Sequence, residues 1–197
     1  MQVCTYMKNT SLRILEAAIK IFARDGVSGA TTREIARAAK VNEVTLFRHF
    51  QNKDELLRQV VLQCSKRSEH VFAEAPFETQ DDLRRTVQNF ATVFSRMLLD
   101  NEDFIRTFFG ELNRHLKLCR RLFVESAKPT RHKFISYLGA AQNSGLVRRN
   151  IDVTTAADAL TGMLVAGVIR RPLTESLYSN ERYVRTCVEL FLKGLEP

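Results

Sequence analysis

Apolar side chains recur three and four residues apart along most of this chain, and no stretch alternates cleanly between apolar and polar residues. Leu15, Ala18, Ile19 and Phe22 are the first example. This spacing is the period of one face of an amphipathic α-helix, whereas a half-buried strand needs a period of two. Only 8 glycines and 4 prolines occur among the 197 residues. The sequence therefore predicts an all-α fold of one large or two small domains.

Helix-capping residues mark two short helices and the start of a longer one. Thr31 and Glu34 form a capping box, in which the side chain of each satisfies a backbone N–H group of the other. Asn42 and Asn52 are expected to cap the two helices that follow. The first two of these helices are joined by a tight turn, which is the arrangement of a helix-turn-helix.

Further capping and helix-breaking residues mark expected ends of other helices. Thr10 and Gly26 are expected to begin and end the first helix. Pro129 is expected near a helix start and Pro172 at a helix end. The expected helices span residues 11–25, 32–39, 43–50, 53 through 64, 81–99, 102–117, 119–126, 129–144, 153–170 and 181–194.

The charge of the chain is strongly positive and concentrated at its start. The formal net charge is +8, and the first 66 residues hold 11 of the 30 basic but only 6 of the 22 acidic side chains. Such an excess suits a polyanionic partner, either nucleic acid or an acidic membrane face. An ordinary solvated basic face has the same sign, so the charge alone does not choose between these interpretations.

Several classes of protein are disfavoured by what the sequence lacks. No run approaches the roughly 18 apolar residues of a membrane-spanning helix, and residues 1–8 lack the apolar region of a signal peptide. A cytoplasmic protein without a membrane partner is therefore expected. The four cysteines suggest neither a zinc site nor a disulfide framework, and no phosphate-binding glycine loop or nucleophile motif occurs. We expect no enzyme, no metal and no cofactor, while redox sensing by a cysteine stays open.

Residues 11–58 resemble the DNA-binding domain of the TetR/AcrR family of bacterial transcriptional regulators. The first matching motif is Ile14-Leu15-x-Ala17-Ala18-x-x-x-Phe22 before a glycine. The second runs from the expected recognition helix into the next helix, as Leu46-Phe47-x-His49-Phe50-x-x-Lys53-x-x-Leu56. The ordered series of three helices is more specific than a single helix-turn-helix would be.

The resemblance implies that the chain has two domains with different functions. Residues 9–56 would form a three-helix, helix-turn-helix DNA-binding domain, and residues 57–197 a larger helical domain for ligand binding and dimerisation. The implied function is that of a homodimeric repressor, which binds a palindromic operator in double-stranded DNA and is released by an unidentified small-molecule effector. Neither the operator nor the effector can be named from the sequence, and repression is not distinguished from activation. A helical module with a protein partner is the competing hypothesis.

The DNA-binding residues expected from this resemblance lie on both short helices. Arg33 is implied to read a base edge, and its guanidinium suits guanine O6 and N7. Phosphate contacts are implied for the hydroxyls of Thr32 and Thr45, the imidazole of His49 and the ammonium group of Lys53. As alternatives, His49 packs internally, or Arg33 pairs with Glu34 in solvent. The full set is Thr32, Arg33, Asn42, Glu43, Val44, Thr45, Arg48, His49 and Lys53.

Three residues depart from the family pattern. Lys40 stands where the turn usually has a glycine, so a residue with a Cβ atom is expected in a left-handed conformation, at a cost of about 1 kcal/mol. Val44 replaces a small residue. Phe47 replaces a tyrosine whose hydroxyl reaches DNA, so one phosphate contact is expected to be missing.

The C-terminal region carries two further sets of expected functional residues. An aromatic cluster is implied to line an effector pocket, and the last two long helices are implied to form a dimer interface. An intramolecular core would show the same apolar spacing in both sets. The pocket set is Phe90, Phe94, Phe108, Leu112, Phe134 and Tyr137, and the interface set is Leu160, Met163, Leu164, Val184, Val188 and Phe191.

Overall fold

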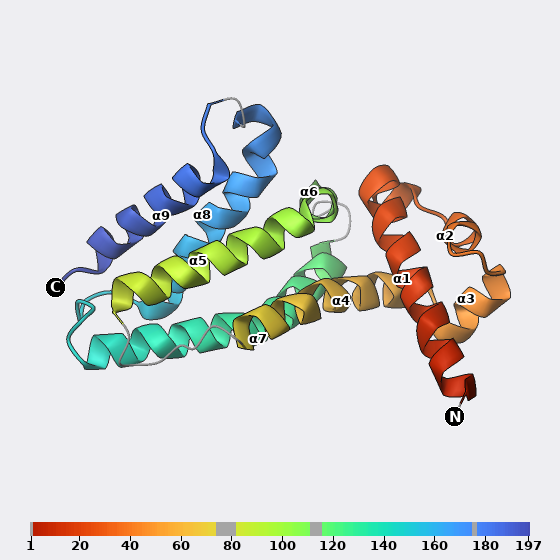
Figure 1. Ribbon diagram of the computed structural model, residues 1–197, viewed down its shortest axis with the longest axis horizontal. Helices are drawn as coiled ribbons and strands as arrows, with labels where there is room; N and C mark the ends of the chain where they lie inside the picture. The colour runs from red at the N-terminus through yellow and green to blue at the C-terminus, as the bar shows by residue number, and fades with distance from the viewer. Residues whose placement is uncertain (1, 74–81, 111–115, 175–176) are drawn as a thin grey trace. The chain divides into compact units, whose positions relative to one another are not determined.

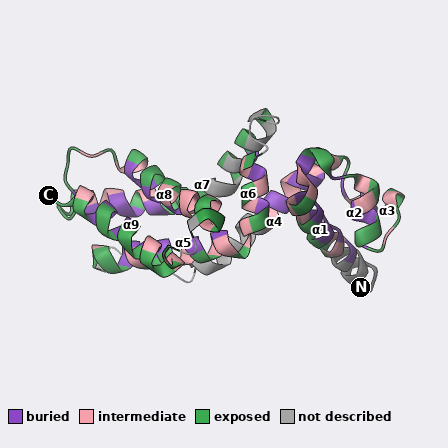
Figure 2. Ribbon diagram, turned by 90° about the horizontal axis from the view of Figure 1, so that it is seen from above, coloured by how far each residue is buried: buried purple, intermediate pink, exposed green. Residues whose placement is uncertain are grey.

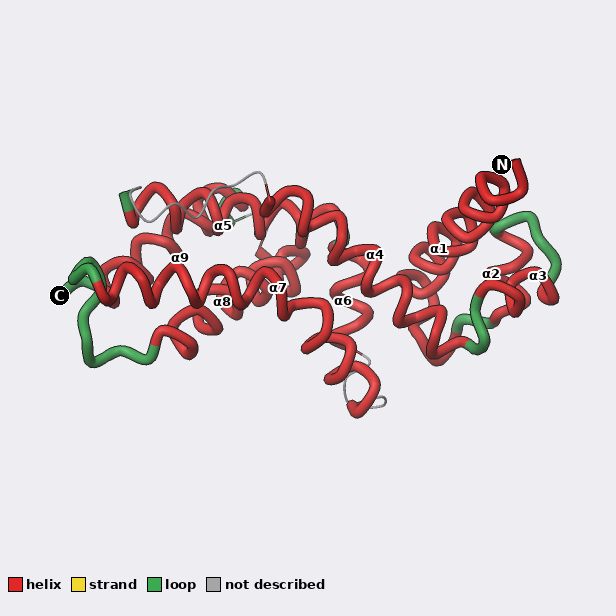
Figure 3. Tube along the Cα trace, turned by 90° about the horizontal axis from the view of Figure 1, so that it is seen from below, coloured by secondary structure: helices red, strands yellow, loops and turns green. Residues whose placement is uncertain are grey.

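A computed structural model describes residues 2–73, 82–110, 116–174 and 177–197 of the chain. Every regular element in these four segments is a helix (Figures 1 and 3). The all-α prediction is therefore confirmed. The helices are α1 (Gln2–Gly29), α2 (Thr32–Ala38), α3 (Glu43–His49), α4 (Lys53–Ala73), α5 (Leu83–Asp100), α6 (Glu102–Gly110), α7 (Leu116–Asn143), α8 (Val153–Thr174) and α9 (Asn180–Leu195).

The expected caps of α2, α3 and α4 are present. The side-chain oxygens of Thr31, Asn42 and Asn52 accept hydrogen bonds from backbone N–H groups three residues later, at 3.2, 2.7 and 2.8 Å. Each bond satisfies one donor that a helix start leaves without an intrahelical partner. The capping box at Thr31 is changed in one respect, because the Glu34 carboxylate accepts a hydrogen bond from Arg24 at 2.8 Å.

The first helix differs from the prediction at its start and agrees at its end. Helix α1 begins at Gln2, so Thr10 lies inside the helix and is not its cap. Gly26 has φ 76° and ψ 168°, which breaks the helical geometry as predicted. A further turn then follows before α1 ends at Gly29. Only a residue without a Cβ atom adopts this conformation at no steric cost.

Two prolines that were expected to bound helices lie inside them. Helix α7 runs through Pro129, and α8 continues past Pro172 to Thr174, so the predicted breaks at both positions were wrong. Each proline removes one hydrogen bond to the carbonyl four residues earlier. Both prolines are exposed, as is Glu125 one turn before Pro129. Water on the exposed side can therefore replace the lost partner of that carbonyl, which lowers the cost of the interruption.

The chain divides into two compact units. Unit 1 comprises Met1–Lys66 and Asp103–Ser126, and unit 2 comprises Arg67–Glu102 and Ala127–Pro197. Helices α4 and α7 contribute residues to both units. Unit 1 thus includes most of α6 and the first part of α7, which lie within the expected domain 57–197. The functional boundary expected between residues 56 and 57 stays a prediction.

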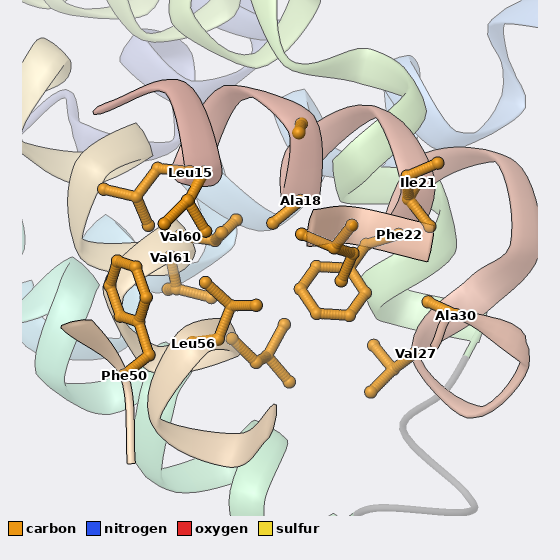
Figure 4. Packing of buried hydrophobic residues seen from close by; sticks show 14 of the residues in the cluster. Leu15, Ala18, Ile21, Phe22, Val27, Ala30, Phe50, Leu56, Val60 and Val61 are labelled. Carbon is orange, nitrogen blue, oxygen red and sulfur yellow. The ribbon is translucent and has the colours of Figure 1, made fainter. Parts of the chain in front are cut away.

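The core of unit 1 is built around α1. Figure 4 shows Phe22 of this helix among apolar side chains that come from α1 and α4. Ile35 of α2 and Leu46 of α3 are completely buried in the same cluster. Helix α6 adds Phe104 and Phe108 to it. One side of each short helix therefore packs against a continuous apolar core, and the other side is exposed to solvent.

The core of unit 2 is formed where α5, α8 and α9 pack against one another. Helices α5 and α9 each present a stripe of buried residues at helical spacing (Figure 2). Helix α7 inserts Phe134, whose ring stacks on Phe90 with 3.9 Å between the centroids and lies 6.3 Å from Phe191. Ser95 and Asn180 exchange hydrogen bonds at 3.0 and 3.3 Å, which joins α5 to α9.

Candidate DNA-binding surface

The turn between α2 and α3 has the strained conformation that its sequence predicted. Lys40 has φ 54°, in the left-handed region that favours glycine. Arg13 of α1 holds this turn, because its Nη2 donates hydrogen bonds to the carbonyl oxygens of Ala39 and Lys40 at 2.5 and 3.2 Å. These bonds satisfy carbonyl groups at the end of α2 with a cation, which also suits the negative end of the helix dipole.

Replacing Lys40 with glycine should stabilise the protein. The substitution removes the steric cost of the left-handed conformation, and part of this gain is offset by the greater entropy of glycine in the unfolded chain. We expect the free energy of unfolding to rise by about 0.5–1 kcal/mol, measured by urea denaturation. Lys40→Ala is the matched control, since it removes the charge but keeps the Cβ atom. Equal stabilities of the two variants would contradict this explanation.

Helix α3 buries one side and exposes the other. Leu46 is its one buried residue, whereas Val44 is 64% exposed and Phe47 is 43% exposed. Arg48 is also exposed. An α-helix that enters the major groove of DNA needs this division, with an anchored back and polar and apolar groups free to meet base edges. Val44 and Arg48 are therefore exposed on α3 as expected, and their contact with bases stays a prediction.

Glu43 connects the two short helices. The hydroxyl of Thr32 on α2 donates to Glu43 Oε1 at 2.5 Å, and Arg33 Nε lies 4.0 Å from Glu43 Oε2. The alternative pairing of Arg33 with Glu34 is not the one in the structure, because Glu34 pairs with Arg24. The side chain of Arg33 remains 89% exposed. Three of the expected DNA-binding residues thus form one local network.

The remaining expected contacts lie around the ends of α3. Asn42 accepts from both the backbone N–H and the hydroxyl of Thr45, each at 2.7 Å. His49 is half-buried, and its ring lies 6.2 Å from that of Phe50. Lys53 is half-buried too, and its Nζ is 3.5 Å from the backbone oxygen of Ser28 in α1. The polar residues of α2, α3 and the start of α4 are thereby gathered in one unit, and their contacts with DNA stay predictions.

Two arginines of α1 that are not among the expected DNA-binding residues contribute to this surface. Arg13 holds the turn, and Arg24 pairs with both Asp25 and Glu34. The bonds of Arg13 to the turn span 26 and 27 residues and the bond of Arg24 to Glu34 spans 10, so no local pattern indicates these partners. A basic residue on the polar side of an amphipathic helix is expected to face solvent.

Comparison with known proteins identifies the family. Residues 14–60 match the family described as bacterial regulatory proteins, tetR family. Residues 81–194, more than half of the chain, match the C-terminal domain described as that of AefR-like transcriptional repressors. The chain belongs to the TetR family. The resemblance found in the sequence is confirmed, and it extends over the C-terminal region.

Relatives within the TetR family align over nearly the whole chain. The uncharacterized HTH-type transcriptional regulator YvkB of Bacillus subtilis is 26% identical over 192 residues, which cover 96% of this chain and 98% of that protein. The HTH-type transcriptional repressor DhaR of a Mycobacterium species is 21% identical and covers 96% and 97%. These matches agree with a DNA-binding transcriptional regulator.

Solved structures share the fold. The fatty acid degradation regulator FadR from Bacillus halodurans has a TM-score of 0.80 at 20% identity, over 94% of this chain and 96% of that one. FadR from Bacillus subtilis, in complex with stearoyl-CoA, has a TM-score of 0.74 at 18% identity, over 94% and 99%. At these identities the likeness shows the TetR-family fold alone.

The expected pocket residues of this TetR-family chain do not form one group. Phe90, Phe134 and Tyr137 are buried in unit 2, and Phe94 is half-buried beside Phe90, with 5.7 Å between the ring centroids. Phe108 belongs to the core of unit 1. Leu112 lies outside the described residues. The aromatic spacing alone did not separate the two units, because both pack phenylalanine side chains.

The expected interface residues are largely buried within a single chain. Their burial fits the intramolecular core that the sequence analysis left as an alternative, while a dimer through α8 and α9 stays a prediction. On the same helices, Ala159, Gly162 and Leu190 are exposed. Five of the expected residues are buried, namely Leu160, Leu164, Val184, Val188 and Phe191, and Met163 is half-buried.

Helix α8 is strongly apolar, although most of its length is not buried inside the chain. Its stretch Val153–Leu173 is long and apolar enough to cross a membrane by length and composition, although no uninterrupted apolar run of that length occurs. Core helices of soluble proteins pass the same test. Only 28% of the stretch is buried inside the chain, so apolar residues of α8 are left partly exposed.

Cys187 of α9 does not have the surroundings of a redox sensor. Its side chain is buried, and this burial raises the pKa of the thiol. A sensing cysteine needs the opposite, a thiolate that is accessible to the oxidant. Cys187 is therefore a core residue. The side chains of the other three cysteines, Cys4, Cys64 and Cys119, lie outside the described residues.

Proposed function

We propose that this TetR-family regulator is a homodimeric repressor that binds a palindromic operator and is released by a small-molecule effector. The observation that carries the proposal is the surface of α2 and α3. There Arg33, Val44 and Arg48 are exposed on helices whose other sides are anchored by Ile35 on α2 and Leu46 on α3. Lys53 adds a positive charge next to these helices. Bases would be read by the exposed side chains and phosphates by the hydroxyl and cationic groups around them.

A homodimer is supported by the apolar surface of α8 and α9. One helix-turn-helix reads one half-site, so a palindrome requires two copies related by a two-fold axis. The small exposed residues Ala159 and Gly162 would let a partner helix approach closely, and Leu190 is 61% exposed. The predicted interface set would then lie mainly beneath this face, where it supports the helices that make contact.

The interior of unit 2 supports an effector that has both apolar and polar groups. Phe90, Phe94 and Phe134 provide stacked apolar rings. One turn before Phe90, the Thr86 hydroxyl is buried with no hydrogen-bond partner among the described residues. Because an unsatisfied buried hydroxyl is costly, this group is suited to a polar atom of a bound molecule. We therefore propose a mainly apolar effector with at least one polar group.

Release from DNA would be a shift between two conformations. The effector must bind the conformation that does not fit the operator more tightly than the one that does. Effector and operator then weaken each other's binding by the same factor. This function places the protein in the cytoplasm, where the DNA is, and its relatives are named as regulators and not as enzymes.

Arg33→Ala tests the proposed readout. A duplex selected by the wild-type chain from a random pool serves as the operator, and affinities are measured by fluorescence anisotropy over a salt series. We expect affinity to fall linearly with salt on logarithmic axes. Arg33→Ala should cost about 1–3 kcal/mol and relax the preference at one base pair in each half-site.

Lys20→Ala is the control for this experiment, since Lys20 is an exposed cation of α1 and the substitution removes the same charge. It should leave the base preference unchanged. If Arg33→Ala also leaves it unchanged, or if no duplex is preferred, DNA readout by this surface is wrong. A helical module with a protein partner would then be the better explanation.

A further inference from the structure

Glu43 interacts with two of the residues that the proposed function assigns to DNA, by a hydrogen bond from Thr32 and an ion pair with Arg33. It is the acidic residue of α3, and its carboxylate is half-buried against α2. One oxygen accepts the hydroxyl proton of Thr32, and the other lies 4.0 Å from Arg33 Nε. Thr32 is an expected phosphate ligand, and Arg33 is the expected reader of a base edge. In the free protein, both therefore face an internal carboxylate.

The chemistry of these groups makes Glu43 a competitor of DNA. A threonine hydroxyl has one proton, so Thr32 donates either to the Glu43 carboxylate or to a phosphate oxygen, but not to both. A carboxylate and a phosphate are alike in being anionic acceptors. Contact between Thr32 and the DNA backbone therefore requires the Thr32–Glu43 hydrogen bond to break, and this frees a negative charge at the DNA surface.

The donors among the base edges of the major groove are the amino groups N4 of cytosine and N6 of adenine, and cytosine N4 is the usual partner of a carboxylate. Where that donor is within reach, Glu43 exchanges one hydrogen bond for another. Where it is not, the carboxylate is left beside phosphates and repels them. The cost of releasing Glu43 thus depends on the sequence of the DNA.

We propose that Glu43 is a specificity-determining residue, an internal hydrogen-bond acceptor for Thr32 and charge partner of Arg33, that penalises DNA lacking a matching amino group. The inference rests on the proposed operator binding and deepens it. Its role is mainly to weaken binding to wrong sites, since a regulator must ignore a large excess of competing sequence. Arg33 and Glu43 together would favour a G·C base pair, with the guanidinium on guanine and the carboxylate on cytosine.

Glu43→Gln separates the charge from the hydrogen bond. The amide oxygen of glutamine still accepts from Thr32, so the contact between the helices is kept while the negative charge is lost. The probes are a duplex selected by the wild-type chain from a random pool and a scrambled duplex of equal composition. We expect Glu43→Gln to bind the scrambled duplex about tenfold more tightly and to change the affinity for the selected duplex much less.

Glu16→Gln is the matched control. Glu16 is exposed on α1 of the same unit, and the substitution changes the net charge equally. It should strengthen binding to both duplexes by the same small factor. Glu43→Ala serves as a second variant, with helical content checked by circular dichroism, and is expected to lose discrimination in the same way.

Two negative results are distinguishable. If the wild-type chain prefers no duplex, operator binding itself is wrong and the inference falls with it. If the wild type discriminates and Glu43→Gln keeps the same ratio of affinities, only the role of Glu43 is overturned. Equal strengthening by Glu43→Gln and Glu16→Gln would also overturn it, because the effect would then be one of net charge.

Discussion

Replacing Phe134 with alanine should lower the free energy of unfolding of unit 2 by about 4 kcal/mol. The Phe134 side chain is completely buried, and its ring stacks on Phe90 of α5 with 3.9 Å between the centroids. It also lies 6.3 Å from the ring of Phe191 on α9. The substitution loses the transfer free energy of the ring and its stacking, and it leaves a cavity that three helices cannot collapse around without losing other contacts.

Amide hydrogen exchange locates this effect. The free energy of opening should fall for the amides of α5 and α9, and it should change little for those of α1 to α3, whose core does not include Phe134. Phe47→Ala is the matched control, because Phe47 is 43% exposed and should change stability by less than about 0.5 kcal/mol. A loss below about 1 kcal/mol in Phe134→Ala would show that the aromatic stack does not hold unit 2 together.

Gly167→Ala should destabilise unit 2 by about 2 kcal/mol. A Cβ atom at position 167 would overlap Cε1 of Tyr183 and would lie 2.8 Å from its Cδ1. The Tyr183 ring is restrained on both sides, because its hydroxyl donates to the Met163 carbonyl at 2.8 Å and its ring stacks on Tyr178. The added methyl group therefore forces α8 and α9 apart or breaks the Tyr183 hydrogen bond.

Gly139→Ala provides a control in the same unit. A Cβ atom at Gly139 of α7 meets nothing within 4 Å, so this substitution should stabilise α7 by about 0.5–1 kcal/mol through better helix propensity. The two glycines should thus respond to the same substitution with opposite sign, measured by urea denaturation. Combining Gly167→Ala with Tyr183→Ala should cost less than the sum of the single changes. Similar responses at both glycines would contradict the packing explanation.

Much of the helix-turn-helix was predictable because its determinants are local. The caps at Thr31, Asn42 and Asn52 lie within three residues of the N–H groups they satisfy. The left-handed Lys40 was expected because the turn of the TetR family usually has a glycine at this position. The exposed and buried sides of α3 follow from the period of the α-helix.

The errors came from two sources. Pro129 and Pro172 were expected to bound helices, yet α7 and α8 continue through these two exposed prolines. Phe108 was grouped with Phe90 by its chemistry, but it packs in the core of unit 1. Side-chain type and spacing show that a residue is apolar on one side of a helix, and they do not show which other helix covers it.

The sequence by itself determined the all-α class, the position of the helix-turn-helix and the family, since capping, turn conformation and helical period act over a few neighbouring residues. The tertiary structure decided which apolar stripes pack together, that most of the expected interface side chains of α8 and α9 are core residues, and that Glu43 faces Thr32 and Arg33. Those outcomes depend on pairs of helices brought together by the fold. The partner of each side chain is therefore set by packing among many residues and not by its own surrounding sequence.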